Sequence, residues 1–314
     1  MLAGTVAHVW RNACCALFRP TFLDLPLAIV LLLAGTASAQ EAPYTLYAAG
    51  DIAQCNKAGP SYSGAEETAK LVEFGLAASP RSAVILLGDV VYPHGTDRDF
   101  ASCYHPTWGR FKDRTWPSPG NHEYATPGAS GYYKYFGKAA GKGYYSLTLG
   151  AWHVISLDSN LKGAAHETQL AWLERELAAS KSRCTLAYWH HPLYSSGWHG
   201  NVPHMRRAWD LLYQAGAELV LAAHDHTYER FAPQDANGRP DRQRGMRQFV
   251  VGTGGAQLTP FVAPVANTEV RDNSRTGVLK LVLAEGGYSW EFLEAVYDGF
   301  PNGAAPDRGA DKCH

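Results

Sequence analysis

Six side chains that can bind metal ions occur in order along the chain, and each follows an apolar segment. They are two aspartates, one asparagine and three histidines: Asp51, Asp89, Asn121, His190, His224 and His226. Two neighbouring metal ions need hard oxygen donors and imidazoles, with one carboxylate bridging them. Each residue alone has a simpler explanation, since a Gly-Asp pair is usually a turn and a His-x-His pair is often a surface feature. The complete ordered set predicts a site for two metal ions.

The pair His224 and His226 indicates how two adjacent ions would be coordinated. One residue separates them, and they follow the apolar run at 218–222. On an extended segment, side chains two residues apart leave the same side of the backbone. Each histidine can therefore bind a different one of two adjacent ions. The cysteines lack the spacing of a zinc knuckle, which disfavours a thiolate site.

The segments between these residues alternate between strand-like and helix-like patterns. Apolar runs predict strands at 44–49, 83–87, 144–149, 152–157, 185–189, 218–222, 248–251, 278–283 and 290–296. Helical spacing predicts helices at 65–78, 167–179 and 205–215. On the first helix, the spacing places Leu71, Phe74 and Ala78 on the core face.

This order of elements predicts an α/β fold with mixed sheets flanked by helices, because the chain begins strand–helix–strand and ends mostly in strands. Nearly every candidate ligand lies just beyond the end of an apolar strand. Open α/β sheets gather their sites at that edge.

Five short blocks give the chain a resemblance to a known family. They are Gly50-Asp51, Gly88-Asp89-Val90-Val91-Tyr92, Gly120-Asn121-His122-Glu123, His190 and His224-Asp225-His226. These blocks resemble the metal-binding motifs of the calcineurin-like metallophosphoesterases. Tyr92, three residues after Asp89, resembles the purple acid phosphatase branch, where that tyrosine binds a ferric ion. The resemblance implies two mixed β-sheets packed as a sandwich between helices, the α-β-β-α metallophosphoesterase fold.

The resemblance also implies a ligand set for two metal ions. The first ion would be held by Asp51, Tyr92 and His226, the second by Asn121, His190 and His224, and Asp89 would bridge them. Fe(III) is implied beside Tyr92, with a divalent ion (Zn, Mn or Fe) at the second position. The chain departs from the family pattern at Ala223, where the family has a glycine.

The implied function is the hydrolysis of phosphate monoesters, as in an acid phosphatase. Metal-activated hydroxide would attack phosphorus, while His122 and His199 match the histidines that contact the phosphate and the leaving group. Phosphodiesters are the alternative within the same fold. A second alternative is an exported binding module with an inactive site, which would be expected to have lost ligands. A single-metal esterase or peptidase is disfavoured because His-Glu-x-x-His and Gly-x-Ser-x-Gly do not occur.

Residues 1–39 have the pattern of a signal peptide. Arg11 and Arg19 precede an apolar run at 25–35, and small residues follow at 36–39. An uncleaved membrane anchor is the alternative. Cleavage would leave one catalytic domain, residues 40–314, that is secreted or periplasmic and has no stable membrane association.

The cysteines and the charge agree with this prediction. Outside the leader there are four cysteines, an even number that indicates two disulfides in an exported protein. Three connectivities are possible, and we favour Cys55–Cys103, whose loops leave the sheet at one edge, together with Cys184–Cys313. The net charge of −1 gives no sign of a nucleic-acid partner, and the expected partner is a small phosphate ester.

Overall fold

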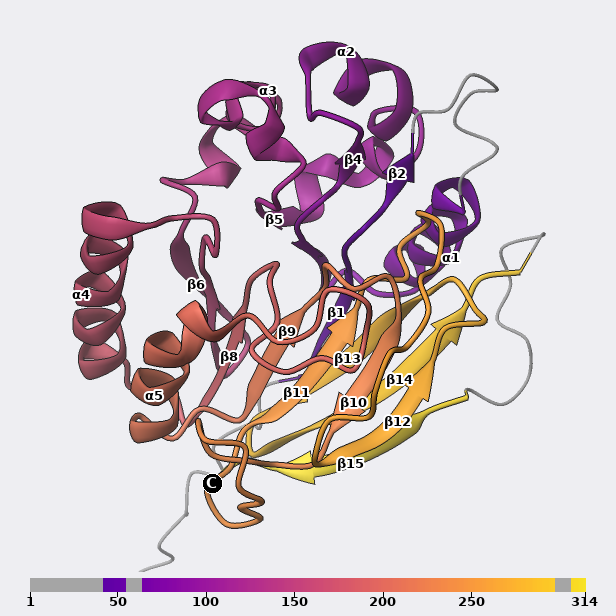
Figure 1. The fold of residues 1–314 in the computed structure, drawn as a ribbon. Coiled ribbons are helices and arrows are strands. Elements are labelled where there is room, and N and C mark those ends of the chain that lie inside the picture. Colours follow the sequence, from indigo (N-terminus) through magenta and orange to yellow (C-terminus); the bar gives the residue numbers. More distant parts are fainter. Residues whose placement is uncertain (1–41, 55–63, 297–305) are drawn as a thin grey trace, which may run out of the picture. The chain divides into compact units, whose positions relative to one another are not determined.

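The computed structural model of the chain describes residues 42–54, 64–296 and 306–314, and most of its strands belong to two mixed β-sheets (Figure 1). The first sheet has the order β15-β14-β13-β1-β3-β5. Its strands are β1 (Tyr44–Ala49), β3 (Ser82–Leu87), β5 (Thr115–Ser118), β13 (Gly277–Ala284), β14 (Gly287–Glu294) and β15 (Arg308–Lys312). β1, β3 and β5 run parallel, and β13 joins β1 in the antiparallel sense.

The second sheet has the order β12-β10-β11-β9-β8-β7-β6. Its strands are β6 (Tyr145–Leu149), β7 (Trp152–Ser156), β8 (Cys184–Tyr188), β9 (Leu219–Ala222), β10 (Tyr228–Phe231), β11 (Arg247–Val251) and β12 (Thr268–Asp272). β7, β8, β9 and β11 are parallel neighbours. The strands predicted at 144–149 and 152–157 form a hairpin, because β6 pairs antiparallel with β7 around Gly150, whose φ is 58°.

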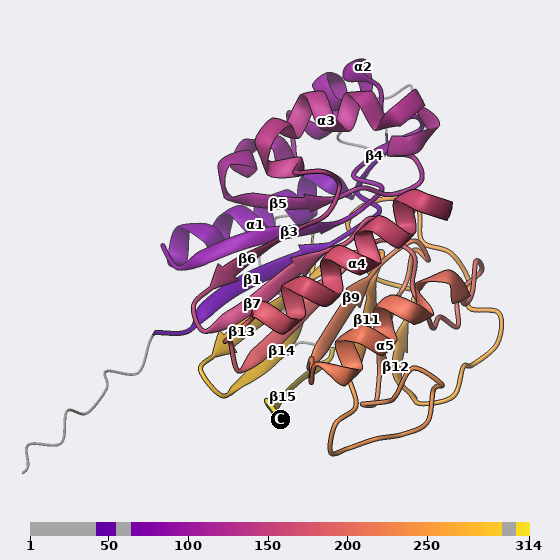
Figure 2. The same cartoon turned by 90° about the vertical axis from the view of Figure 1, so that its left-hand side faces the viewer.

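The two sheets pack face to face, and helices cover the second sheet on its other side (Figure 2). Along β9, Leu219 and Leu221 belong to the core shared with the first sheet, whereas Val220 packs beneath the helices. This alternation follows from the two-residue period of a strand. The covering helices are α4 (Gly163–Ala179) and α5 (Arg206–Gln214). The predicted fold class is confirmed.

Helix α1 (Ala65–Ala78) packs against the first sheet through a face that includes Leu71, as predicted, but not Phe74 or Ala78. The bounds agree with the prediction, but Phe74 is 55% exposed and Ala78 is also exposed. The buried face is Ala65, Thr68, Ala69, Leu71, Val72 and Leu76. Ala65, Ala69 and Gly75 are small, so the helix can approach the sheet closely, and a Cβ at Gly75 would overlap Tyr47. Phe74 lies outside this buried face.

Short elements lie in the connections that follow β1, β3 and β5. They are β2 (Ala53–Gln54), β4 (Val91–Tyr92), α2 (Asp97–Asp99) and α3 (Ser130–Phe136). The parallel pairing of β2 with β4 sets Tyr92 opposite Gln54, close behind the loop that carries Asp51. Among the described helices, none is both long enough and apolar enough to cross a membrane.

One disulfide joins the two sheets at the end of the chain. Cys184, at the start of β8, is bonded to Cys313, with 5.7 Å between their Cα atoms, which confirms the predicted pair. Cys55 lies outside the described residues, so the pair Cys55–Cys103 stays a prediction. Peptide mapping without reduction is expected to recover both pairs. A peptide that joins Cys55 to Cys184 would contradict both.

Glu218 is a buried carboxylate beside this disulfide, 2% exposed. It accepts hydrogen bonds from the backbone N–H of Thr185 at 2.6 Å and of His314 at 3.3 Å. Burial raises the pKa of Glu218 to about 7, although these hydrogen bonds and the charge of Arg183 oppose the shift.

We expect the free energy of unfolding to fall as the pH rises from about 4.5 to about 7. In this window the folded chain keeps Glu218 protonated while the unfolded chain releases the proton, so rising pH favours unfolding. The shift of the Glu218 pKa from 4.5 to about 7 corresponds to about 3 kcal/mol in the free energy of unfolding. Glu218→Gln should remove the contribution of Glu218 to this dependence, which denaturant titrations at several pH values would show as a smaller slope. The same pH slope in variant and parent would disprove the role of Glu218.

Candidate metal centre

Five of the predicted ligands lie two or three residues beyond the carboxyl ends of parallel strands. Asp51 follows β1, Asp89 follows β3, Asn121 follows β5, His190 follows β8 and His224 follows β9. The first three strands belong to one sheet and the last two to the other. The centre is therefore formed where the ends of the two sheets meet.

One group of donors surrounds the phenol of Tyr92. Its hydroxyl donates to Asp51 Oδ1 at 2.7 Å and lies 3.0 Å from His226 Nε2. His226 Nδ1 lies 2.6 Å from the carbonyl oxygen of Gln257, which can only accept. Nδ1 therefore carries the proton, and Nε2 presents its lone pair toward Tyr92 and Asp51 in the neutral ring.

A second group surrounds His190, which is fully buried. Its Nε2 lies 3.1 Å from Asn121 Oδ1, from His224 Nδ1 and from Asp89 Oδ2. His190 Nδ1 donates to the carbonyl oxygen of Leu87 at 2.8 Å, so Nε2 is the free nitrogen of the neutral ring.

Asp89 lies between the two groups. Its Oδ2 is 3.4 Å from the Tyr92 hydroxyl and 3.1 Å from His190 Nε2. The structure thus brings all seven predicted donors together, with the predicted bridging carboxylate in the central position.

Three of these donors have left-handed backbone conformations. The φ angles are 57° at Asp51, 48° at Asp89 and 73° at His224. Such conformations are uncommon outside glycine and cluster at functional sites, where the surrounding structure holds them. Asp51 is held through its side chain, since Oδ2 accepts the backbone N–H of His224 at 2.8 Å. The strain therefore lies at the residues that converge on the centre.

The carboxylates draw positive charge into the centre. Burial opposes a charged imidazole at His190, but Asp89, Asp51 and the carbonyl oxygen of Leu87 together outweigh it and raise the pKa of His190 to about 9. At His226, Asp51, the carbonyl oxygen of Gln257 and Asp89 together outweigh burial and raise the pKa to about 9. Burial and the neighbouring His190 lower the pKa of His224 to about 3, so this ring stays neutral. Converging carboxylates, an amide oxygen and imidazoles are donors that fit two cations.

Comparison with known proteins places this chain in a family. A family model described as calcineurin-like phosphoesterase matches residues 37–228, more than half of the chain. The chain belongs to this family. Purple acid phosphatase 15 from Arabidopsis thaliana is 27% identical over 221 residues, which cover 58% of this chain and 41% of that protein. An acid phosphatase from Aspergillus ficuum is 38% identical over 90 residues, covering 26% and 15%. The chain spans less than half the length of these relatives.

A solved structure supports the fold of this calcineurin-like phosphoesterase. The purple acid phosphatase PPD1 from seeds of yellow lupin, Lupinus luteus, superposes with a TM-score of 0.65 at 19% sequence identity. The likeness covers 86% of this chain and 54% of the lupin chain. At this identity it shows a common fold.

The departure at Ala223 is accommodated by the facing residue. A Cβ built on Gly50 would lie 2.5 Å from the Cβ of Ala223. Because residue 50 is glycine, the side chain of Ala223 fits between the two ligand loops.

The two predicted catalytic histidines lie beside different donor groups, His122 beside Tyr92 and His199 beside His224. His122 Nδ1 donates to the carbonyl oxygen of Pro93 at 2.7 Å, and its Nε2 is 3.9 Å from Asp89 Oδ2. The ring of His199 lies 4.3 Å from the ring of His224, and the residue is exposed. Both therefore border the donors and are accessible to solvent.

Two buried acids support the ligand loops, and neither was predicted from the sequence to have a function. Glu123 accepts the backbone N–H groups of Asp89, Val90 and Gly120 at 2.7 to 2.9 Å. Asp225 accepts the backbone N–H of His199 at 2.7 Å and the hydroxyl of Ser195. Glu123 and Asp225 both belong to the sequence blocks that carry the family resemblance, and their place in those blocks is the sequence feature that could have identified them.

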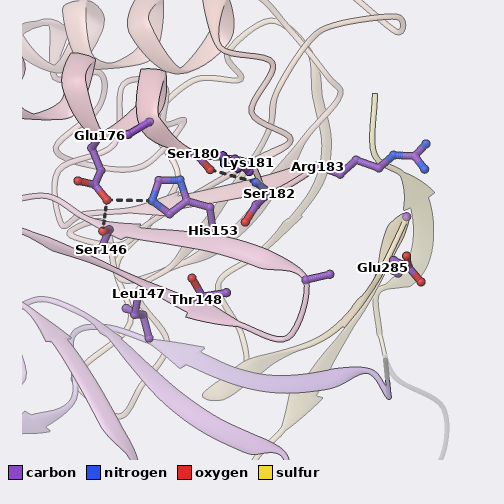
Figure 3. Close-up of a pocket in the computed structure, with 13 residues that line it drawn as sticks. Ser146, Leu147, Thr148, His153, Glu176, Ser180, Lys181, Ser182, Arg183 and Glu285 are labelled. Atoms are coloured by element: carbon purple, nitrogen blue, oxygen red, sulfur yellow. Dashed lines mark hydrogen bonds and ion pairs between the residues drawn. The ribbon is translucent and has the colours of Figure 1, made fainter. Parts of the chain in front are cut away.

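A cavity of about 960 Å³ lies away from the centre, beside β6, β7 and the end of α4 (Figure 3). It contains His153, whose Nε2 is 3.4 Å from Glu176 Oε1. Ser146 donates its hydroxyl to Glu176 and not to His153, so the imidazole does not activate a nucleophile. None of the predicted ligands lines this cavity.

Proposed function

We propose that the chain is a dinuclear-metal phosphatase that hydrolyses phosphate monoesters. The observation that carries this proposal is the convergence of six oxygen and nitrogen donors around a central carboxylate, Asp89. Membership of the calcineurin-like phosphoesterases and the similarity to acid phosphatases support the reaction class.

In this proposal each ion has its own donors and one in common. The first would be held by Asp51, Tyr92 and His226, the second by Asn121, His190 and His224, with Asp89 between them. Fe(III) fits beside the phenol of Tyr92, and Zn, Mn or Fe(II) fits the second position. When bound, the ions supply Lewis acidity and a nucleophile derived from water at neutral pH.

The histidines at the rim would handle the phosphate and the leaving group. His122, fixed by Pro93, is positioned to donate a hydrogen bond to a phosphoryl oxygen. His199 is held through its backbone by Asp225, and its exposed ring is positioned to protonate a departing alkoxide. Glu123 keeps the loops of Asp89 and Gly120 in register for this chemistry.

We also propose export, in which residues 1–39 are a cleaved leader and residues 40–314 form the catalytic domain. The Cys184–Cys313 disulfide supports this proposal, since such bonds persist in oxidising compartments. N-terminal sequencing of the mature protein tests it.

Elemental analysis with ester assays tests the proposed activity. We expect two metal ions per chain and turnover of alkyl and aryl phosphate monoesters in preference to diesters. Faster turnover of diesters would identify a phosphodiesterase. Bound metals without turnover of either class would identify a binding module.

The phenol of Tyr92 makes a separate prediction about colour. A tyrosinate bound to Fe(III) gives a charge-transfer absorption band, so the iron-loaded protein should be coloured. Tyr92→Phe should lose the band in visible spectroscopy, while Tyr124→Phe, which removes a hydroxyl bonded to Asp158, should keep it. A colourless and fully active protein that holds only divalent ions would refute the ferric assignment alone.

A further inference from the structure

His191 is a second histidine at the edge of the centre, directly after the ligand His190. A ring nitrogen of His191 lies within 4.8 Å of ring nitrogens of both His190 and His224. Its ring centroid is 4.4 Å from that of His224 and 4.8 Å from that of His190. The side chain is partly exposed, so the ring borders the space in front of the second group of donors.

Ser159 fixes the ring of His191. The Oγ of this buried serine accepts the backbone N–H of His191 at 3.1 Å and lies 2.8 Å from His191 Nδ1. In the part of the chain that the structure describes, the Ser159 hydroxyl has no other acceptor within hydrogen-bond distance. The hydroxyl proton therefore goes to Nδ1, and the ring carries its own proton on Nε2.

The loop of Ser159 is itself held from several sides. His204 Nε2 donates to the Ser159 carbonyl oxygen at 2.7 Å. Neighbouring Asp158 accepts the hydroxyl of Tyr124 at 2.6 Å and the backbone N–H of Asn160 at 2.8 Å. This network holds Ser159 in place, so that its hydroxyl can donate to Nδ1 of His191.

We propose that His191 is a phosphate-binding residue whose Nε2–H donates to a phosphoryl oxygen of the substrate. A nitrogen that carries a proton cannot bind a metal ion, which separates His191 from its neighbour His190. Nε2 has no hydrogen-bond partner among the described residues, so it is available to a ligand. The inference rests on the proposed phosphatase function, and Ser159 is its positioning residue.

Binding of inorganic phosphate to the metal-loaded full chain, measured by calorimetry, tests this proposal. His191→Leu removes the donor at similar size and should weaken phosphate binding about tenfold, the loss expected for one hydrogen bond. His191→Gln keeps an N–H donor and should retain most of the affinity. His105→Gln, a surface histidine bonded to Tyr135, is the matched control and should change nothing.

Ser159→Ala gives an independent readout of the positioning role. The ¹⁵N spectrum of the zinc-loaded protein should show the Nε2–H tautomer of His191 in the parent and its partial loss in the variant. Metal content should stay at two ions per chain throughout. Loss of one ion in His191→Leu would overturn the proposal, because His191 would then be a ligand. Unchanged phosphate affinity in that variant, or no phosphate binding by the parent, would overturn it as well. Phosphate binding without ester turnover would contradict the proposed phosphatase function but not the role of His191 in binding phosphate.

Discussion

Asp89→Ala is expected to abolish hydrolysis of every phosphate ester alike. The central carboxylate contacts both donor groups, so its loss disrupts both proposed ion positions. Residues that only orient metal ligands cost about 10–100-fold when they are replaced, so loss of the bridge should exceed about 100-fold. Elemental analysis and assays on alkyl and aryl esters measure the effect.

Two controls separate this effect from a folding defect. Asp89 has a φ of 48°, which asparagine tolerates better than alanine, so Asp89→Asn removes the charge with less backbone strain. Asp307→Asn removes another buried carboxylate, which pairs with Arg230 and should lower stability without loss of metal. An active Asp89→Asn variant that holds both ions would contradict the bridging role.

His199→Ala is expected to retain both metal ions and to lose activity selectively. If His199 protonates the leaving group, alkyl esters should lose about 10²- to 10⁴-fold in kcat/KM. Activated aryl esters need little protonation and should lose much less. The comparison requires both ester classes and elemental analysis of the same preparation.

The competing explanation is that His199 only completes the loop held by Asp225. Its removal would then lower stability and affect all substrates equally. Equal losses on alkyl and aryl esters, with both ions bound, would therefore exclude the general-acid role. Ser195→Ala tests the loop separately, because it removes a hydroxyl bonded to Asp225 and leaves the imidazole in place.

Several donors were predictable from the sequence because they stand two residues beyond an apolar strand. Asp51 and Asp89 follow β1 and β3 after one glycine, and His224 follows β9 after Ala223. Residue type and strand ends together were sufficient for these positions. The packing of two sheets as a sandwich came from the family resemblance, because strand order across sheets depends on contacts far apart in the chain.

The missed features are those that depend on tertiary contacts. Glu123 supports Asp89 from 34 positions away, and Ser159 fixes His191 from 32 positions away, so neither contact leaves a local pattern. The edge strands β12 and β15 were also missed, because they are polar or exposed and lack an apolar run. On α1 the periodicity gave the bounds and Leu71 but misplaced Phe74 and Ala78, since the close approach of Gly75 to Tyr47 selects small residues.

The division of the donors between two sheets has a consequence for how the protein acquires its metals. Asp51 and Asp89 leave the first sheet, whereas His190 and His224 leave the second, and the sheets are joined by contacts distant in sequence. Neither proposed coordination sphere is complete until the sheets have docked. In this proposal a complete coordination sphere would therefore exist only after the two sheets have docked. Added ions should raise the melting temperature of the apoprotein, and the rise should grow with the logarithm of the free-ion concentration above the dissociation constant.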